Sequence, residues 1–179
     1  MKSLLLRPFC YETDIRDLYA YMTEPCSQAL FSHKFQINTI HGFEKWLTEM
    51  LRTQYHDFFM IADTAGNTLG FTFSYDFFPN DGHCKFTLCL YTKYTKQGFG
   101  VIAAVKMLDY LFSSYSLLQV FTTVFSYNHE SLAIHKHGGF RKVGELPNYR
   151  YFRGSLHSLH CYVIEREVFY DVANRFLSR

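Results

Sequence analysis

A strand, a tight glycine turn and a helix follow one another in the middle of this chain, and they constrain its fold most strongly. Apolar side chains alternate along residues 83–91, as they do in a strand with one buried face. Val101, Val105 and Leu108 then repeat at helical spacing within residues 99–113. The connection between the two elements contains Lys96-Gln97-Gly98-Phe99-Gly100. This order predicts a sheet covered by helices.

The glycine turn predicts an anion site. The first turn of a helix presents backbone N–H groups without intrahelical partners, and the helix macrodipole adds positive potential there. Gly98 and Gly100 permit close approach of the backbone to a phosphate, and Lys96 adds a nearby cation. These features suit a pyrophosphate. A Gly-x-Gly turn on its own, however, is most often a purely structural turn.

Two nucleotide-binding motifs do not fit this turn. A P-loop needs Gly-Lys-Ser/Thr after its first glycine, and this chain has Val101 after Gly100. A dinucleotide-binding fold needs a third glycine and an acidic residue at the end of the next strand, and residues 117–125 end without one. The turn therefore predicts a phosphate-bearing ligand of another kind.

A second segment identifies that ligand through a family resemblance. Residues 88–112 resemble the acetyl-CoA-binding motif of the GNAT superfamily of N-acetyltransferases. Residues 128–140 resemble the second signature of that family, with Asn128, Ser131 three positions later, and Gly139-Phe140. The start of the chain, at Leu6-Arg7-Pro8, and its end, at residues 154–162, resemble the subgroup of ribosomal-protein N-terminal and polyamine acetyltransferases. The resemblance covers almost the whole chain and implies the GNAT-like acyl-CoA N-acyltransferase fold.

The resemblance also implies the site residues. It assigns acetyl-CoA contacts to Leu88, Leu90, Thr95, Lys96, Gln97, Gly98, Phe99, Gly100, Val101, Asn128 and Ser131. It also implies that a backbone N–H at the end of the strand polarises the acetyl carbonyl. Two positions depart from the family pattern. Thr95 stands where the family usually has Gln or Arg, and His135 replaces the tyrosine that often protonates the leaving thiolate.

Each candidate catalytic residue has a structural alternative. His135 could donate a proton to the sulfur at neutral pH, or it could be a helix-face histidine with a local partner. Asn128 could hold the pantetheine arm or a water near the sulfur, or it could cap the following helix. His83 is the remaining candidate for a general base, because Asp76 and Asp81 flank a turn that they would stabilise.

Hydrophobic periodicity predicts one mixed α/β domain over residues 1–179, with a mostly antiparallel central sheet and flanking helices. Strands are expected at residues 4–7, 58–63, 68–75, 83–91, 117–125, 140–144 and 160–165. One helix is expected to begin at Thr13 or Asp14 and to end at Pro25. Four further helices are expected to span residues 42–55, 99–113, 130–137 and 170–177. Pro79 to Gly82 predicts a turn. Ligands in such sheets often sit where central strands splay apart.

Composition excludes several classes of protein. A net charge of +2 is too balanced for nucleic-acid binding, and no apolar run reaches the roughly 20 residues of a membrane span. The five cysteines, Cys10, Cys26, Cys84, Cys89 and Cys161, form no C-x-x-C pair, which favours free thiols and a cytoplasmic protein. His157, His160 and Cys161 lack a second pair of ligands, so no metal is expected.

These observations predict an acetyl-CoA-dependent N-acetyltransferase that acts on a primary amine of a small molecule or of a peptide or protein N-terminus. A non-catalytic acyl-CoA-binding regulatory relative and a structural domain are the alternatives. Acceptor contacts are expected from Tyr19, Tyr21 and Phe31 and from a late loop at residues 149–152. An acidic lining would indicate polyamines, but Asp14 and Glu24 alone do not establish one. The 19 Phe and 14 Tyr residues also suggest a homodimer through the aromatic C-terminal strands.

Overall fold

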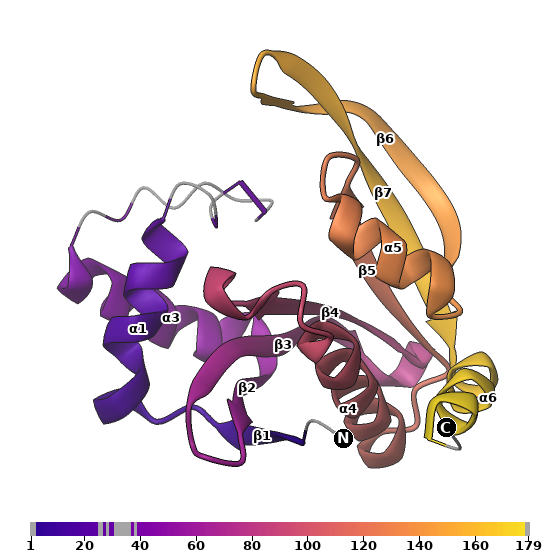
Figure 1. The fold of residues 1–179 in the computed structure, drawn as a ribbon, viewed down its shortest axis with the longest axis horizontal. Helices are drawn as coiled ribbons and strands as arrows, with labels where there is room; N and C mark the ends of the chain where they lie inside the picture. Colours follow the sequence, from indigo (N-terminus) through magenta and orange to yellow (C-terminus); the bar gives the residue numbers. More distant parts are fainter. Residues whose placement is uncertain (1–2, 25–26, 28, 31–36, 38, 178–179) are drawn as a thin grey trace.

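The computed structural model describes residues 3–24, 27, 29–30, 37 and 39–177 of the chain (Figure 1). Its elements are β1 (Leu4–Pro8), α1 (Tyr11–Thr23), α3 (Ile40–Thr53), β2 (Tyr55–Asp63), β3 (Thr68–Phe78), η1 (Pro79–Asp81), β4 (His83–Leu90), η2 (Thr92–Tyr94), α4 (Phe99–Ser114), β5 (Gln119–Phe125), α5 (His129–His137), β6 (Arg141–Phe152), β7 (Ser155–Glu165) and α6 (Arg166–Leu177). Pro25, Cys26 and Phe31, which carried predictions above, lie outside the described residues.

The sheet has seven strands in the order β1-β2-β3-β4-β5-β7-β6. Every neighbouring pair is antiparallel except β4 and β5, which confirms the predicted mixed α/β class. The parallel β4–β5 ladder has only three pairs: His83 with Gln119, Cys84 with Val120, and Lys85 with Phe121. Beyond Lys85 the two strands diverge, as Figure 1 shows. The predicted splay between central strands is therefore present.

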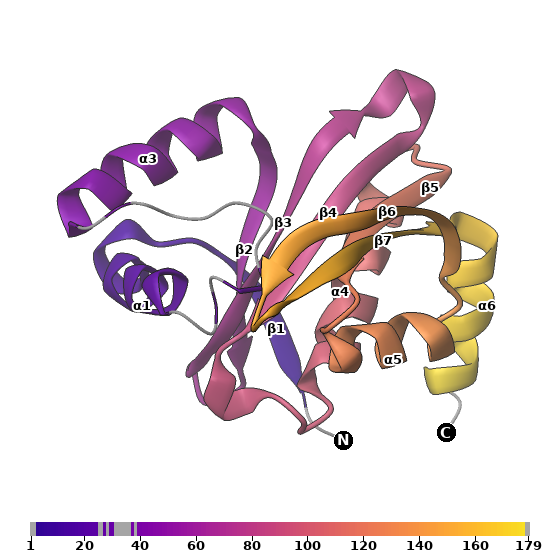
Figure 2. The ribbon, with the colours of Figure 1, turned by 90° about the horizontal axis from the view of Figure 1, so that it is seen from above.

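Helices cover both faces of the sheet (Figure 2). On one face, α1 and α3 bury Leu18 and Phe43 against Phe71 of β3. On the other face, α4 buries Met107 and Leu111 together with residues of β4 and β5. The apolar stripes that predicted these helices are thus the surfaces that hold them to the sheet.

The predicted start of the first helix is wrong. The helix begins at Tyr11 with Cys10 as its N-cap, and Asp14 lies inside its first turn. The Asp14 carboxylate is buried and accepts hydrogen bonds from Arg7 at 2.6 and 2.7 Å and from the Cys10 N–H at 2.8 Å. Burial acts to raise the pKa of Asp14, but these hydrogen bonds leave it below its usual value. An ion pair with Arg7, seven residues earlier in β1, therefore holds this side chain.

The last two strands are longer than predicted. Residues 149–152, expected in a loop, belong to β6, which forms a long hairpin with β7 that extends away from the helices (Figure 1). Pro147 and the register shift between Leu146 and Arg150 are tolerated because β6 is the edge strand. Asn148, with φ 54°, takes up the irregularity. Helix α6 also begins at Arg166, four residues earlier than predicted.

Candidate functional site

The glycine turn forms an open cradle at the start of α4. Gly98 is the N-cap, with φ 84°, and Lys96 also has a positive φ, of 59°. A Cβ added to Gly98 would meet nothing within 4 Å, so the backbone faces open space there. A Cβ at Gly100 would instead lie 3.5 Å from Ile134 Cδ1 and 3.7 Å from Leu90 Cδ1. Gly98 thus lies on the open side of the cradle, and Gly100 faces neighbouring side chains.

The polar residues of the cradle mainly support the turn itself. The N–H and the hydroxyl of Thr95 both donate to the Thr92 carbonyl, at 3.3 and 3.0 Å. Gln97 Nε2 donates to the Lys93 carbonyl at 2.9 Å. Lys96 Nζ lies 3.3 Å from Glu130 Oε1, in the first turn of α5. Lys96 therefore links the two predicted family signatures across the surface.

Asn128 caps α5, and its side-chain oxygen accepts the Ser131 N–H at 3.2 Å. Because β4 and β5 run parallel, the segments that follow them lie at the same edge of the sheet. The cradle after β4 and the Asn128 cap after β5 are therefore neighbours. The cap that was the structural alternative for Asn128 is present, and its side chain also lies at the predicted coenzyme site.

His135 is buried behind this cap. Its side chain packs between Phe140 and Tyr162, with ring centroids 4.5 and 4.8 Å away. Nδ1 lies 2.7 Å from the Ser131 carbonyl and donates to it, whereas the buried Nε2 has no partner among the described residues. Burial lowers the pKa of His135, and the hydrogen bond to Ser131 offsets this only in part. The imidazole is therefore mostly neutral at pH 7, and its Nε2 is an acceptor.

His83 does not lie with the other predicted residues. It begins β4, whereas the cradle follows the end of that strand, so seven residue steps, or about 23 Å, separate His83 from Leu90. Its ring contacts Phe78 and Phe121, at centroid distances of 5.1 and 5.7 Å. The structure thus brings together the cradle, Asn128, Ser131 and His135, and leaves His83 at the closed end of the splay.

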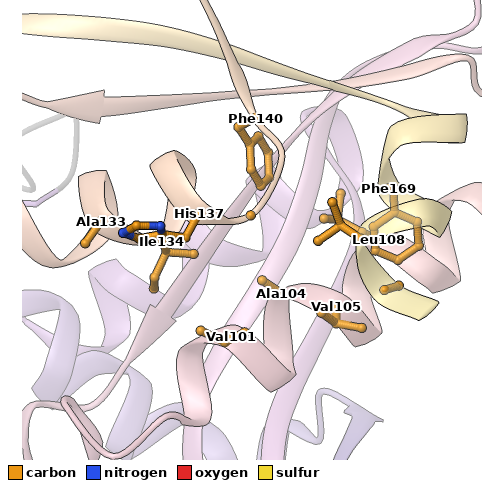
Figure 3. Close-up of a pocket in the computed structure, with 12 residues that line it drawn as sticks. Val101, Ala104, Val105, Leu108, Ala133, Ile134, His137, Phe140 and Phe169 are labelled. Carbon is orange, nitrogen blue, oxygen red and sulfur yellow. The ribbon is translucent and has the colours of Figure 1, made fainter. Parts of the chain in front are cut away.

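An apolar cavity of about 270 Å³ adjoins the cradle between α4, α5 and α6 (Figure 3). It is lined by Val101, Ala104, Val105, Leu108, Ala133, Ile134, His137, Gly138, Phe140, Phe169, Val172 and Ala173. Of the predicted coenzyme contacts, it includes only Val101. Its mainly apolar lining suits an uncharged group better than a phosphate.

The sequence did not single out a group of hydroxyls at the splay. Thr87 and Thr123 follow the last β4–β5 pair by two residues and share the face covered by α1 and α3. The phenol of Tyr75, on β3, interacts with both hydroxyls. Burial raises the pKa of Tyr75, and the hydrogen bond with Thr87 lowers it only in part. Three strands contribute these residues, so no motif along the chain indicates them.

The described part of the chain shows neither a membrane-spanning helix nor a cluster of metal ligands. None of its helices is long and apolar enough to span a membrane. None of its His, Cys, Asp and Glu side chains gather in a group of three or more that could hold a metal ion. Among the described cysteines, Cys10, Cys84, Cys89 and Cys161 are free thiols.

Known acetyltransferases resemble this chain in sequence and in fold. A curated relative, the SPbeta prophage-derived uncharacterized N-acetyltransferase YokL of Bacillus subtilis (strain 168), is 25% identical over 129 residues, which cover 72% of each chain. The spermidine N-acetyltransferase of Vibrio cholerae, solved with CoA and spermine, has a similar fold, with a TM-score of 0.84 at 15% identity over 93% of this chain and 98% of that chain. The spermidine/spermine N-acetyltransferase SpeG of the same organism, solved with manganese ions, gives a TM-score of 0.77 at 16% identity over 94% and 95% of the two chains.

The family itself is established by a direct match to the sequence. Residues 3–141 match the family model described as an acetyltransferase (GNAT) domain. The matched region includes β1 to α5 and thus both the glycine cradle and the Asn128 cap. The chain therefore belongs to the GNAT family of acetyltransferases.

Proposed function

We propose that the protein transfers an acetyl group from acetyl-CoA to a primary amine of a small molecule or of a peptide or protein N-terminus. The observation that carries the proposal is the position of the Gly98 cradle and the Asn128 cap at one edge of the sheet, on either side of the splay between β4 and β5. Spermidine and spermine, named with the Vibrio cholerae enzymes, are amines, which supports an amine acceptor here.

The cradle would hold the pyrophosphate. Backbone N–H groups in the first turn of α4 point out of the helix, and its macrodipole favours an anion there. Gly98 leaves the approach open, because a Cβ in that direction is absent. Acetyl-CoA supplies the activated thioester. The residues of this chain would fix its position relative to the splay.

Transfer requires that a C–N bond forms as the C–S bond breaks, while the amine nitrogen loses a proton and the sulfur gains one. Past Lys85, β4 no longer pairs with β5, so this length of strand is where its backbone could polarise the acetyl carbonyl. Holding the two substrates together at the splay supplies much of the acceleration.

The proposed roles of the polar residues differ in their support. Asn128 stabilises the start of α5 and could also contact the coenzyme arm. The lowered pKa of His135 favours a packing role over that of a general acid. The position of His83 gives no support to its role as a base, so we propose catalysis without a dedicated base.

A titration with acetyl-CoA, followed by a thiol-release assay with a panel of amines, tests the proposal. Gly98→Ala should weaken acetyl-CoA binding at least about 10-fold, because alanine at this positive φ disturbs the cradle. Gly66→Ala is the matched control, since Gly66 has φ 87° and equally open surroundings in the β2–β3 turn. Binding without turnover would indicate the non-catalytic alternative, and no binding at millimolar acetyl-CoA would defeat both functions.

We also propose that the protein is a cytoplasmic homodimer. The free thiols support a reducing compartment. The β6–β7 hairpin supports self-association, because its edge strand and its exposed Leu146, Tyr151 and Leu156 are available to a second copy.

A further inference from the structure

Three side-chain hydroxyls lie together on one face of the sheet where β4 and β5 begin to diverge. Tyr75 lies on β3, opposite Lys85 of β4, and its phenol interacts with the hydroxyls of Thr87 and Thr123. These two threonines are the first residues on this face beyond the last β4–β5 pair, Lys85 with Phe121. Tyr75 therefore reaches across β4 to the start of the splay, and the three residues form a hydroxyl cluster there.

Solvent reaches the hydroxyl cluster. Tyr75, Thr87 and Thr123 are half-buried in the folded chain. Phe73 and Cys89 lie on the same face, two residues closer to the cradle, and both are buried in the core under α1 and α3. The helix layer thus covers this face as far as Phe73 and Cys89 and leaves the hydroxyl cluster accessible to a small molecule.

The coenzyme and the amine would reach the splay from opposite faces of the sheet. Helix α4, which follows the cradle, packs on the face opposite α1 and α3. Acetyl-CoA held by the cradle would therefore enter the splay from the α4 side, with its acetyl group directed toward the face of Tyr75. An amine that attacks the acetyl carbon would approach from that face, beside the hydroxyl cluster.

The hydroxyl cluster suits the uncharged form of an amine, which is the form that has a lone pair for attack. A phenol both donates and accepts hydrogen bonds, so Tyr75 can keep a contact with a threonine and also accept an N–H of the amine. Burial raises the pKa of Tyr75, so its phenol is uncharged at neutral pH. Lys85 and Asp76, which both act on this phenol electrostatically, pair with each other at 2.9 Å. The cluster thus offers hydrogen bonds from groups that carry no charge of their own.

We propose that Tyr75 is a catalytic residue that binds the attacking amine, and that Thr87 and Thr123 hold its phenol in place. This inference rests on the proposed acetyl transfer and adds a residue to it. The phenol oxygen accepts one N–H of the amine and so orients the nitrogen lone pair toward the acetyl carbon, while Tyr75 keeps its own proton. Such orientation of a reactant contributes to the acceleration without a dedicated base.

Tyr75→Phe tests the inference, because it removes the hydroxyl and keeps the ring. With the amine that the wild type acetylates best, kcat/KM should fall by about 10- to 100-fold, while the Kd for acetyl-CoA stays within about twofold. Tyr55→Phe is the matched control. Tyr55 faces Tyr75 across the β2–β3 ladder but lies one strand farther from the splay, so this variant should keep kcat/KM within about twofold.

Two results of this comparison would overturn the inference. Unchanged kcat/KM in Tyr75→Phe would show that its hydroxyl does not contact the amine. An equal loss in Tyr55→Phe, or a loss of acetyl-CoA binding in Tyr75→Phe as large as the loss of kcat/KM, would indicate a structural role. Thr123→Val gives a further check: combined with Tyr75→Phe, it should add less than its separate effect, because it acts through the same phenol.

The inference and the proposed function can fail separately. If the wild type acetylates none of spermidine, phenethylamine and trialanine, each amine is titrated into the CoA-loaded wild type and into Tyr75→Phe. Binding that the variant weakens at least about threefold would keep Tyr75 as the amine-binding residue and defeat only the acetyl transfer. Equal binding to both proteins, or no binding, would defeat the inference as well.

Discussion

At the scale of single residues, burial decides what His135 can do. An exposed histidine changes charge near pH 6.5, but this imidazole lies between two aromatic rings and gives its Nδ1 proton to the Ser131 carbonyl. Its charged form is therefore disfavoured, and its pKa lies below the usual value. At neutral pH the imidazole is therefore mostly uncharged, which argues against the general-acid role that the family resemblance suggested for it.

His135→Phe tests this reading through the pH dependence of stability. Below pH 6.5 the unfolded chain binds a proton at this histidine that the folded chain resists, so its contribution to stability is complete above pH 6.5 and is lost as the pH falls through the folded pKa. Urea unfolding should show a smaller loss of stability between pH 7 and pH 5 for the variant than for the wild type, by up to about 1.4 kcal/mol per pH unit. Equal slopes would contradict the lowered pKa. Thiol release over pH 6–9 is the second readout, and a variant with full kcat excludes the acid role.

The structural role of a residue could be predicted from the sequence where that role depends on its neighbours along the chain. Gly98 and Asn128 act within a few residues of the chain, through a positive φ and a helix cap, and both were identified from sequence. The partners of Tyr75, in contrast, come from two other strands. Its role depends on the register of the sheet, which no local pattern contains.

At the scale of elements, Gly70 sets how closely β3 and β4 approach. It faces Leu90 in the ladder, and a Cβ added there would lie only 2.0 Å from the Cys89 carbonyl oxygen and 2.8 Å from Leu90 Cα. These atoms belong to the backbone and cannot move as a flexible side chain would. Glycine is thus required beside the end of β4, from which the chain passes through η2 into the cradle.

Gly70→Ala should lower the free energy of unfolding by about 2–3 kcal/mol, because the two strands must separate locally. Gly144→Ala is the control. It substitutes another strand glycine, whose added Cβ would lie 3.7 Å from the Cys161 side chain, and should change stability by less than about 0.5 kcal/mol. Urea unfolding measures both, and equal stabilities of the two variants would contradict the proposed close contact.

Elements were predictable where periodicity is clear. The apolar stripe of α4 predicted its span to within one residue, since one face of that helix is buried from Ala103 to Phe112. The strands predicted for the β6–β7 hairpin were too short. Most of β6 is exposed, so its sequence lacks the apolar–polar alternation that marks a half-buried strand. Pro147 and Asn148 also suggested a loop, although an edge strand can accommodate both.

At the scale of the whole molecule, the hairpin predicts the oligomeric state. Tyr151 and Leu156 face each other across the ladder and are 70% and 57% exposed, which favours burial against a second copy. We expect a dimer by light scattering, and a monomer when both residues are changed to Lys. Leu118→Lys is the control, because Leu118 is 68% exposed but lies before β5, beside Arg166 and at the opposite end of β7 from the hairpin turn. A wild-type monomer, or dimers in all variants, would reject this interface.

The three-pair ladder between β4 and β5 also has a consequence for the motions of the protein. It is the narrowest connection in the sheet, so the half made by β1 to β4 and the half made by β5 to β7 should open as separate cooperative units in hydrogen exchange. A ligand bound along the splay would contact both halves and merge their opening into one event. Acetyl-CoA should therefore slow amide exchange along this seam more than in the interior of either half.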